Sequence, residues 1–315
     1  MEKQLGYQDI SLEPQKCIVM SRRDCQTDIT LGNHSFEMPI YPANMKSVVN
    51  TDTCAYLAKN GWFYTMHRFG VDTLGFIRYM QAIQQITSIS VGVNKDSYET
   101  LSQIYNEPLE VDFITIDVAN AWSEKAHDMV AYIKDKFPQT FLIVGNVATG
   151  NAAREVESWG ADAIKVGIAG GSVCITKNKT GVHRPMVSTI RECVSATKSD
   201  TIIIADGGIV EHGDIAKAIA CGADMVMAGS LFAGYDQSAG SIIEIGDTEY
   251  KEYYGSASKH NKEEVKNIEG KKTLIKYRGD MDRLLKELKE DLQSSISYTG
   301  GLSLSDLKYV GLFEV

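Results

Sequence analysis

The sequence lacks the features by which several classes of protein are recognised. Its first residues, MEKQLGYQDISLEPQK, contain no apolar stretch of the kind that a signal peptide needs. No run in the chain approaches the roughly eighteen apolar residues that cross a bilayer. These two absences predict a cytoplasmic protein that does not bind membranes.

Paired cysteines are also missing. The cysteines are scattered and include no CxxC pair, which argues against a zinc site and against a disulfide framework in a chain of 315 residues. Most of them should therefore be buried, unreactive thiols. Their positions are Cys17, Cys25, Cys54, Cys174, Cys193 and Cys221.

Positive charge is scarce. The chain has 32 Lys and Arg residues against 41 Asp and Glu residues, which gives a net charge of −9. A long nucleic acid needs a basic surface, so we do not expect a nucleic-acid polymer as a partner. A single phosphate is still allowed, because backbone N–H groups at the start of a helix bind it without net positive charge.

Repeats, linkers and low-complexity segments are absent as well, so we expect one domain over residues 1–315. What the chain does contain is a series of eight short apolar runs, each followed by a helix-like stretch. Such runs are typical of buried parallel strands. They cover residues 39–42, 62–66, 89–93, 113–116, 141–144, 163–166, 202–205 and 225–228.

The spacing of these runs predicts an α/β fold, a (β/α)₈ TIM barrel. Six of the seven intervals are about 20–28 residues long, close to a βαβ unit of about 30 residues, and eight such units make a barrel. A doubly wound open sheet is the alternative. It predicts a glycine-rich fingerprint after the first strand, where this chain has PANM at residues 42–45.

Two irregular stretches are candidates for function. The interval after residue 166 is about a dozen residues longer than the others, and extra length at the carboxyl end of a barrel strand is typical of an active site. We therefore predict a catalytic loop at about 167–189. The polar, lysine-rich stretch at about 255–275 is predicted to be a mobile flap, with a solvated surface loop as the alternative.

The loop after the sixth run holds the first candidate for chemistry. Residues 167–176 read GIAGGSVCIT, and small residues of this kind let a ligand approach the backbone closely. Cys174 lies on this loop, and a thiol at the top of a barrel is reactive when its pKa is lowered. On position alone, a buried inert thiol is an equally good interpretation.

Two glycine-rich turns predict a site for a nucleotide monophosphate. Asp206 to Gly208 follow the seventh run and Gly229-Ser230 follow the eighth, which is where barrels often bind phosphate. Asp206 would accept hydrogen bonds from a ribose diol. A tight turn of the chain would explain either glycine-rich segment by itself.

Asp117 and Asn146 lie at the ends of the fourth and fifth runs, where side chains face the site of a barrel. Helix capping is the alternative role for these two residues.

Together these segments resemble the family of IMP dehydrogenase and GMP reductase. The resemblance covers nearly the whole chain, and its most specific motifs are PANM at 42–45, GNVAT at 145–149, the Cys174 loop, ADGGI at 205–209 and YGSAS at 254–258. The fold of this family is a (β/α)₈ barrel. Its members usually form tetramers and bind a monovalent cation through loop carbonyls, which implies a homotetramer and a K⁺ site at Gly167 and Gly171.

The resemblance also implies roles for individual residues. Cys174 would attack C2 of the purine and form a covalent thioimidate, while Thr176 and Glu269 would handle the proton of the departing ammonia. Asp117, Ala119 and Asn146 would bind the nicotinamide cofactor. GMP or IMP would contact Ser172, Asp206, Gly207, Gly208, Gly229, Ser230, Tyr254, Gly255, Ser256 and Ser258.

The two branches of the family differ in direction. The dehydrogenase oxidises IMP with NAD and hydrolyses its intermediate with an Arg-Tyr pair in the flap, whereas the reductase converts GMP to IMP and ammonia with NADPH. Residues 256–272 contain no arginine, and Arg278 lies beyond them. The chain also has no room for the regulatory insert of the dehydrogenase. The resemblance therefore implies an NADPH-dependent oxidoreductase of purine metabolism that reduces GMP.

Two other functions remain open. One is a dehydrogenase that lacks the regulatory insert, and the other is a nucleotide-binding homologue without activity. The second is supported only by departures from the family pattern: residues 169–171 are Ala-Gly-Gly in place of Gly-Pro-Gly, and residues 182–186 read VHRPM. Retention of Cys174, Thr176 and Glu269 argues against it.

Overall fold

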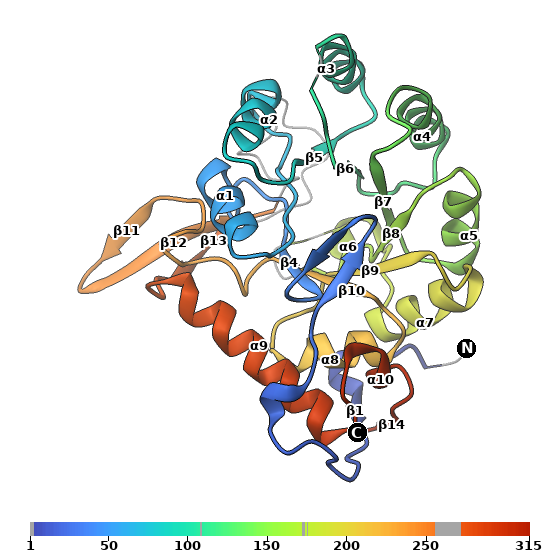
Figure 1. The fold of residues 1–315 in the computed structure, drawn as a ribbon, viewed down its shortest axis with the longest axis vertical. Helices are drawn as coiled ribbons and strands as arrows, with labels where there is room; N and C mark the ends of the chain where they lie inside the picture. The colour runs from blue at the N-terminus through green and yellow to red at the C-terminus, as the bar shows by residue number, and fades with distance from the viewer. Residues whose placement is uncertain (1–2, 108, 172–173, 175, 256–271) are drawn as a thin grey trace.

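The computed structural model describes residues 3–107, 109–171, 174, 176–255 and 272–315. Its centre is a curled sheet of seven parallel strands in the order β4-β10-β9-β8-β7-β6-β5, with helices around the outside (Figure 1). This confirms the predicted α/β barrel fold. The strands are β4 (Ile40–Pro42), β5 (Ser88–Val91), β6 (Phe113–Asp117), β7 (Phe141–Val147), β8 (Ala163–Val166), β9 (Ile202–Asp206) and β10 (Met225–Ala228).

The second predicted strand, at residues 62–66, is not a strand, so this part of the prediction was wrong. Only Met66 forms a bridge, to Ile89 of β5. The reason lies in Tyr64, whose hydroxyl donates to the carbonyl of Ile86 and accepts from the backbone N–H of Ser88. A side chain thus makes hydrogen bonds that a strand would make through its backbone.

Helices follow the strands, as the spacing predicted. The long interval before β9 contains two of them, so the predicted catalytic loop includes α6 and the start of α7. The helices are α1 (Thr51–Lys59), α2 (Thr73–Ala82), α3 (Lys95–Asn106), α4 (Glu124–Lys136), α5 (Gly150–Ser158), α6 (Thr176–Thr180), α7 (Met186–Ala196), α8 (Gly213–Ala220), α9 (Met281–Tyr298) and α10 (Leu304–Leu307). Among the described residues, no helix is long and apolar enough to cross a membrane.

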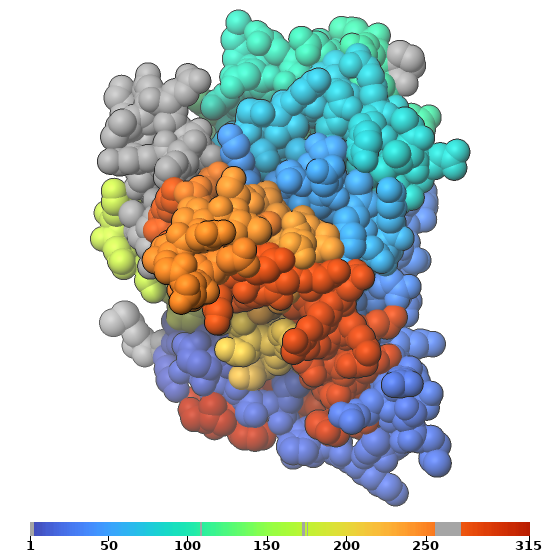
Figure 2. All heavy atoms as spheres, turned by 90° about the vertical axis from the view of Figure 1, so that its left-hand side faces the viewer, coloured from blue at the N-terminus to red at the C-terminus, as the bar shows by residue number. Residues whose placement is uncertain are grey.

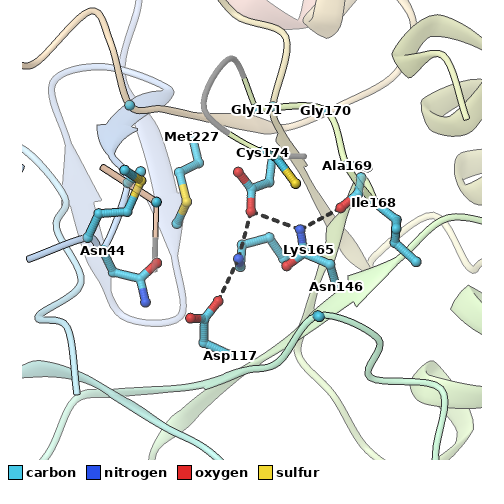
Figure 3. Close-up of a pocket in the computed structure, with 18 of the residues that line it drawn as sticks. Asn44, Asp117, Asn146, Lys165, Ile168, Ala169, Gly170, Gly171, Cys174 and Met227 are labelled. Atoms are coloured by element: carbon cyan, nitrogen blue, oxygen red, sulfur yellow. Dashed lines mark hydrogen bonds and ion pairs between the residues drawn. The ribbon is translucent and has the colours of Figure 1, made fainter. Parts of the chain in front are cut away.

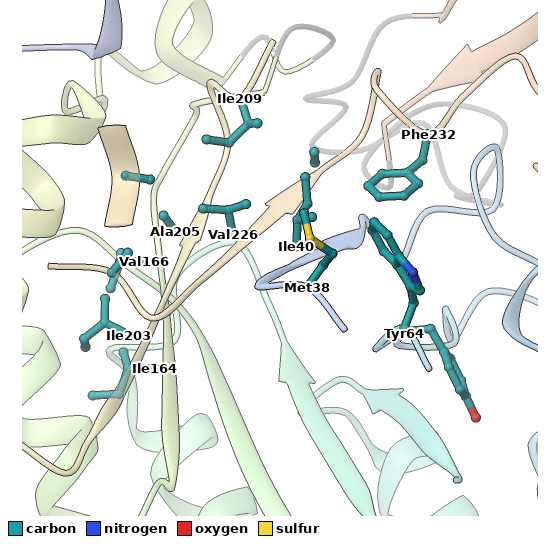
Figure 4. Close-up of a cluster of buried hydrophobic side chains, with 14 of the residues drawn as sticks. Met38, Ile40, Tyr64, Ile164, Val166, Ile203, Ala205, Ile209, Val226 and Phe232 are labelled. Atoms are coloured by element: carbon teal, nitrogen blue, oxygen red, sulfur yellow. The ribbon is translucent and has the colours of Figure 1, made fainter. Parts of the chain in front are cut away.

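The sheet separates two apolar clusters. The larger one lies between the strands and the surrounding helices and includes Ile164, Val166, Ile203, Ala205 and Val226 (Figure 4). The smaller one fills the inside of the barrel. Because both faces of each strand are buried, the strands read as continuous apolar runs in the sequence.

The inner cluster is built on aromatic rings at the amino ends of the strands. Phe63 lies at its centre, with ring centroids 4.8 Å from Tyr41, 5.0 Å from Phe113 and 5.1 Å from Phe36. Phe36 belongs to a hairpin of β2 (Ile29–Leu31) and β3 (His34–Phe36), which also adds Leu31 to the cluster. The hairpin therefore closes this end of the barrel and leaves the carboxyl ends for a site.

Elements outside the barrel form two further sheets. β1 (Ile10–Leu12) pairs with β14 (Leu312–Glu314), while β11 (Ile242–Ile245), β12 (Thr248–Tyr254) and β13 (Lys272–Lys276) form an antiparallel sheet. In Figure 2 the residues of β11 and β12 stand forward as an orange patch next to the red-orange α9. The last part of the predicted flap thus belongs to β13, and residues 256–271 lie outside the described residues. Two 3₁₀ turns, Tyr7–Asp9 and Arg22–Asp24, complete the secondary structure of the described residues.

We expect Phe63→Ala to lower the free energy of unfolding by about 3–5 kcal/mol, because it leaves a cavity among three packed rings. Chemical denaturation followed by circular dichroism measures this loss. Tyr309→Ala is the control: Tyr309 is 88% exposed, so its loss should stay within about 0.5 kcal/mol. Equal losses for the two variants would contradict the central place of Phe63.

Candidate functional site

A large cavity opens at the carboxyl ends of the barrel strands. Its volume is about 1170 Å³, and its walls come from the segments that follow β4, β6, β7, β8, β9 and β10. Pockets for single small molecules are typically about 300–1,000 Å³, so this cavity has room for a nucleotide and part of a second ligand. Its place is the one where barrel enzymes carry their active sites.

The cavity brings together most of the residues that the sequence singled out. They are Cys174 and Thr176, the cofactor candidates Asp117, Ala119 and Asn146, the substrate candidates Asp206, Gly207, Gly208, Gly229, Ser230 and Gly255, and the cation candidates Gly167 and Gly171. Four predicted site residues, Ser172, Ser256, Ser258 and Glu269, lie outside the described residues.

Tyr254 is placed differently from the prediction. The cavity is lined by its neighbour Tyr253, because successive side chains of a strand point to opposite faces. The backbone of Tyr254 instead pairs with Ser47, whose hydroxyl donates to the Tyr254 carbonyl over 2.8 Å. The structure therefore brings this segment to the cavity through Tyr253, and the contact of Tyr254 with a nucleotide stays a prediction.

Cys174 differs from the buried cysteines of the chain. It is partly exposed and lines the cavity, and its thiol donates to the hydroxyl of Thr176 over 3.2 Å. Cys193 and Cys221 are buried, and burial raises the pKa of the Cys193 thiol to about 12 and of the Cys221 thiol to about 11. Of the two interpretations left open for Cys174, this placement favours the reactive thiol.

Glycines allow the Cys174 loop to touch the turn that follows β9. A Cβ added to Gly207 would lie 2.9 Å from the carbonyl carbon of Gly170, and one on Gly167 would lie 2.1 Å from the carbonyl oxygen of Asp206. Gly167 and Gly207 also have positive φ values of 132° and 110°, which residues with a side chain rarely adopt. The loop that carries the thiol and the turn that carries Asp206 therefore form one packed unit.

Lys165 is a residue of this site that the sequence reasoning missed. Its ammonium donates to Asp117 Oδ1 over 2.9 Å and to Asp206 Oδ2 over 2.7 Å, and the residue is 2% exposed (Figure 3). Burial alone would lower the pKa of Lys165, but Asp117 and Asp206 outweigh this and raise it. Burial alone would raise the pKa of Asp117, but Lys165, together with Arg68 and Asn44, outweighs this and lowers the pKa of that carboxyl.

A signal for Lys165 was present in the sequence. It is the one charged residue in the sixth apolar run, and a buried lysine is rare unless it is paired. Gly145 of β7 stands opposite it in the sheet, and a Cβ there would lie 2.5 Å from the Cβ of Lys165. The glycine of the GNVAT motif thus makes room for the lysine.

The charge of the cavity differs from that of the chain. Its charged lining residues are Lys46, Arg68 and Lys165 against Asp96, Asp117 and Asp206, so the described lining is balanced although the chain carries −9. An anionic ligand is therefore not repelled from the cavity. Asn44 adds a donor, because its buried amide lies close enough to Asp117 to lower the pKa of that carboxyl.

The turn after β10 is held from behind by Arg278. The guanidinium donates to the carbonyl of Ser230 over 3.1 Å and to that of Leu231 over 3.3 Å. Tyr253 lies over the same turn, since a Cβ on Gly229 would stand 2.2 Å from its hydroxyl oxygen. Both contacts fix the place where the sequence predicted a phosphate.

The predicted cation ligands make hydrogen bonds in this structure. The carbonyl of Gly167 accepts from the Asn146 side chain over 2.6 Å, and the carbonyl of Gly171 accepts from the Cys174 backbone over 3.0 Å. Their geometry gives no support of its own to a K⁺ site, which stays a prediction.

Known proteins resemble this chain over nearly its whole length. The family model described as "IMP dehydrogenase / GMP reductase domain" matches residues 77–314. The chain belongs to the IMP dehydrogenase / GMP reductase family. It is 58% identical over 315 residues to a GMP reductase of Chromobacterium violaceum, covering 100% of this chain and 99% of that protein.

More distant relatives in this family carry the same name. A GMP reductase of Bacillus thuringiensis is 49% identical over 313 residues, covering 98% of this chain and 95% of the relative. A GMP reductase of Variovorax paradoxus is 48% identical over 307 residues, covering 96% and 94%. These matches confirm the resemblance that the sequence motifs indicated.

One departure from the family pattern has a visible cost. Ala169 has a φ of 61°, a left-handed conformation that costs a residue with a side chain about 1–2 kcal/mol. Ala169→Gly removes this strain, and the larger entropy that glycine loses on folding offsets part of the gain. We therefore expect the free energy of unfolding to rise by up to about 1 kcal/mol. Ala131→Gly, at an exposed position within α4, should instead lower it by about 1 kcal/mol; urea denaturation of both variants measures the difference in sign.

Gly229→Ala should lower the free energy of unfolding by about 1–3 kcal/mol, because the new methyl group displaces Tyr253. Gly213→Ala is the matched control, since a Cβ there meets nothing within 4 Å and alanine favours the helix that begins there. Thermal denaturation should show opposite shifts for the two variants. A Gly229→Ala protein as stable as the parent would show that Tyr253 does not pack on this turn.

Proposed function

We propose that this chain catalyses the NADPH-dependent reductive deamination of GMP to IMP and ammonia, through a covalent thioimidate on Cys174. The observation that carries the proposal is that Cys174 and Thr176 share one cavity with Asp206 and Asp117. These residues are the nucleophile, its neighbour and the two carboxylates suited to ribose hydroxyls. The relatives named GMP reductase support the choice of substrate.

In this proposal GMP lies across the turns after β9 and β10. The ribose diol donates to Asp206, and the 5′-phosphate binds the backbone of Gly229 and Ser230 at the turn held by Arg278. Because the Asp206 turn packs against the Cys174 loop, the purine is brought next to the thiol. Asp117 and Asn146 hold the nicotinamide nucleotide on the other side, and that nucleotide supplies a hydride.

The chemistry then divides into two steps. The Cys174 sulfur attacks C2 of GMP, and the exocyclic amine leaves as ammonia with a proton handled by Thr176 and Glu269, which gives the thioimidate. A hydride delivered to C2 and departure of the Cys174 thiolate then yield IMP. Such covalent catalysis replaces one difficult displacement by two easier steps.

The structure adds an argument against the dehydrogenase alternative. That reaction uses a flap arginine, and Arg278 is the nearest one in the sequence after residues 256–272. Its guanidinium donates hydrogen bonds to the carbonyls of Ser230 and Leu231, so Arg278 holds the turn that we assign to the phosphate.

We further propose a single domain, a homotetramer, a K⁺ site and a cytoplasmic location. These proposals rest on the family resemblance and the composition alone.

The test follows nicotinamide absorbance with purified protein, NADPH and GMP. We expect a decay that requires GMP, and Cys174→Ala should slow it at least about a thousandfold. Cys193→Ala, which changes a buried cysteine, should leave the rate within about threefold.

The other outcomes separate the alternatives. A rise in absorbance with IMP and NAD, without a decay on GMP, would establish the dehydrogenase. Calorimetric binding of GMP without turnover in either direction would establish a non-catalytic homologue. A decay that Cys174→Ala does not slow would contradict the role of the thiol.

A further inference from the structure

We infer that Lys165 is a positioning residue that serves both ribose sites at once: its ammonium lets Asp117 and Asp206 stand side by side as charged carboxylates, each able to hold its own ribose. The inference rests on the proposed function, because that function assigns Asp206 to the nucleotide substrate and Asp117 to the nicotinamide nucleotide.

The geometry of the ion triad is the first support. One ammonium donates to both carboxylates, over 2.9 Å to Asp117 and 2.7 Å to Asp206. The bonded carboxylate oxygens must therefore lie within about 6 Å of each other, a distance at which like charges disfavour ionisation. Arg68 also favours the charged form of Asp117, but Lys165 is the cation that bonds to both carboxylates. Without it, the two could not both remain charged at neutral pH at low cost.

The second support is the arrangement of Asp206. Its Oδ2 accepts from both Lys165 and Asn146, the latter over 2.8 Å. Among the described residues no donor bonds to its Oδ1, and Asp206 lines the cavity. Lys165 and Asn146 thus fix one oxygen of the carboxylate and leave the other for a ligand.

The third support is that nothing else in the fold explains a lysine at this position. Lys165 lies on a strand whose residues are all buried. The nearby buried Tyr41 does not account for the lysine either, because the Tyr41 hydroxyl bonds to no described residue. A buried ion pair adds little net stability compared with an apolar packing of the same size. We therefore assign the lysine to the site and not to the stability of the barrel.

The test measures binding of IMP by calorimetry at pH 6 and pH 8 in the parent protein and in Lys165→Met. We expect the variant to bind IMP at least about tenfold more weakly at neutral pH, because a buried charge has lost its partner. Repulsion between the carboxylates raises their pKa values, and a protonated Asp206 accepts ribose hydroxyls poorly. The ratio of variant to parent Kd should therefore be larger at pH 6 than at pH 8, and taking the ratio cancels the titration of the IMP phosphate itself.

The decisive variant is the double substitution Lys165→Met with Asp117→Asn. It removes the second charge, so the lysine is no longer needed. The Kd of the double variant for IMP should therefore be within about threefold of that of the Asp117→Asn single variant, and the ratio of these two Kd values should be the same at pH 6 and pH 8. Lys134→Met, which removes a half-buried lysine paired with Asp162 at 2.7 Å outside the cavity, should bind IMP like the parent protein.

Circular dichroism and thermal denaturation report folding in each variant. If Lys165→Met alone is unfolded and the double variant folds and binds IMP, the inference is supported, since the lysine is required only when both carboxylates are present. The inference is overturned by a double variant that is as unfolded as Lys165→Met or that binds IMP as weakly as Lys165→Met. A Lys165→Met protein with parental affinity at both pH values overturns it as well. Failure of the proposed function appears elsewhere, as a parent protein that neither binds IMP nor oxidises NADPH with GMP.

Discussion

The candidate site depends on the register of the parallel strands β6 to β9. In that register Asp117 stands beside Gly145, and Gly145 stands beside Lys165, while Asp206 ends the next strand. A shift of one residue in β8 would turn Lys165 outward into the apolar layer beneath the helices. The apolar packing of Ile164 and Val166 in that layer therefore also keeps the ammonium of Lys165 on the inner face of the sheet.

This dependence explains what the sequence could and could not predict. Seven of the eight apolar runs became barrel strands, because a run that is buried on both faces keeps its pattern whatever its neighbours are. Residues 62–66 have the same pattern but do not form a strand, because the Tyr64 hydroxyl makes hydrogen bonds to Ile86 and Ser88 in place of backbone groups. The composition of the run does not show these bonds. Positions at strand ends were predicted well for the same topological reason: parallel strands end at one edge.

Side-chain pairing was harder to predict than position. Lys165 is 48 residues from Asp117 and 41 residues from Asp206 in the sequence, so nothing local indicates that its charge is matched. Tyr253 and Tyr254 are adjacent, and only the pleat of β12 decides between them. Motifs thus located the segments of the site, whereas electrostatic partners and the facing of individual side chains required the folded chain.

The antiparallel sheet outside the barrel gives the flap region a fixed base. Tyr254 of β12 and Lys272 of β13 are cross-strand partners, so the two strand ends that border this region stand side by side. Lys251, buried in β12, anchors this base through the carbonyls of Tyr235 and Ser238. The position of Gly255, which follows β12 and lines the cavity, therefore depends on an ammonium that is buried outside the barrel.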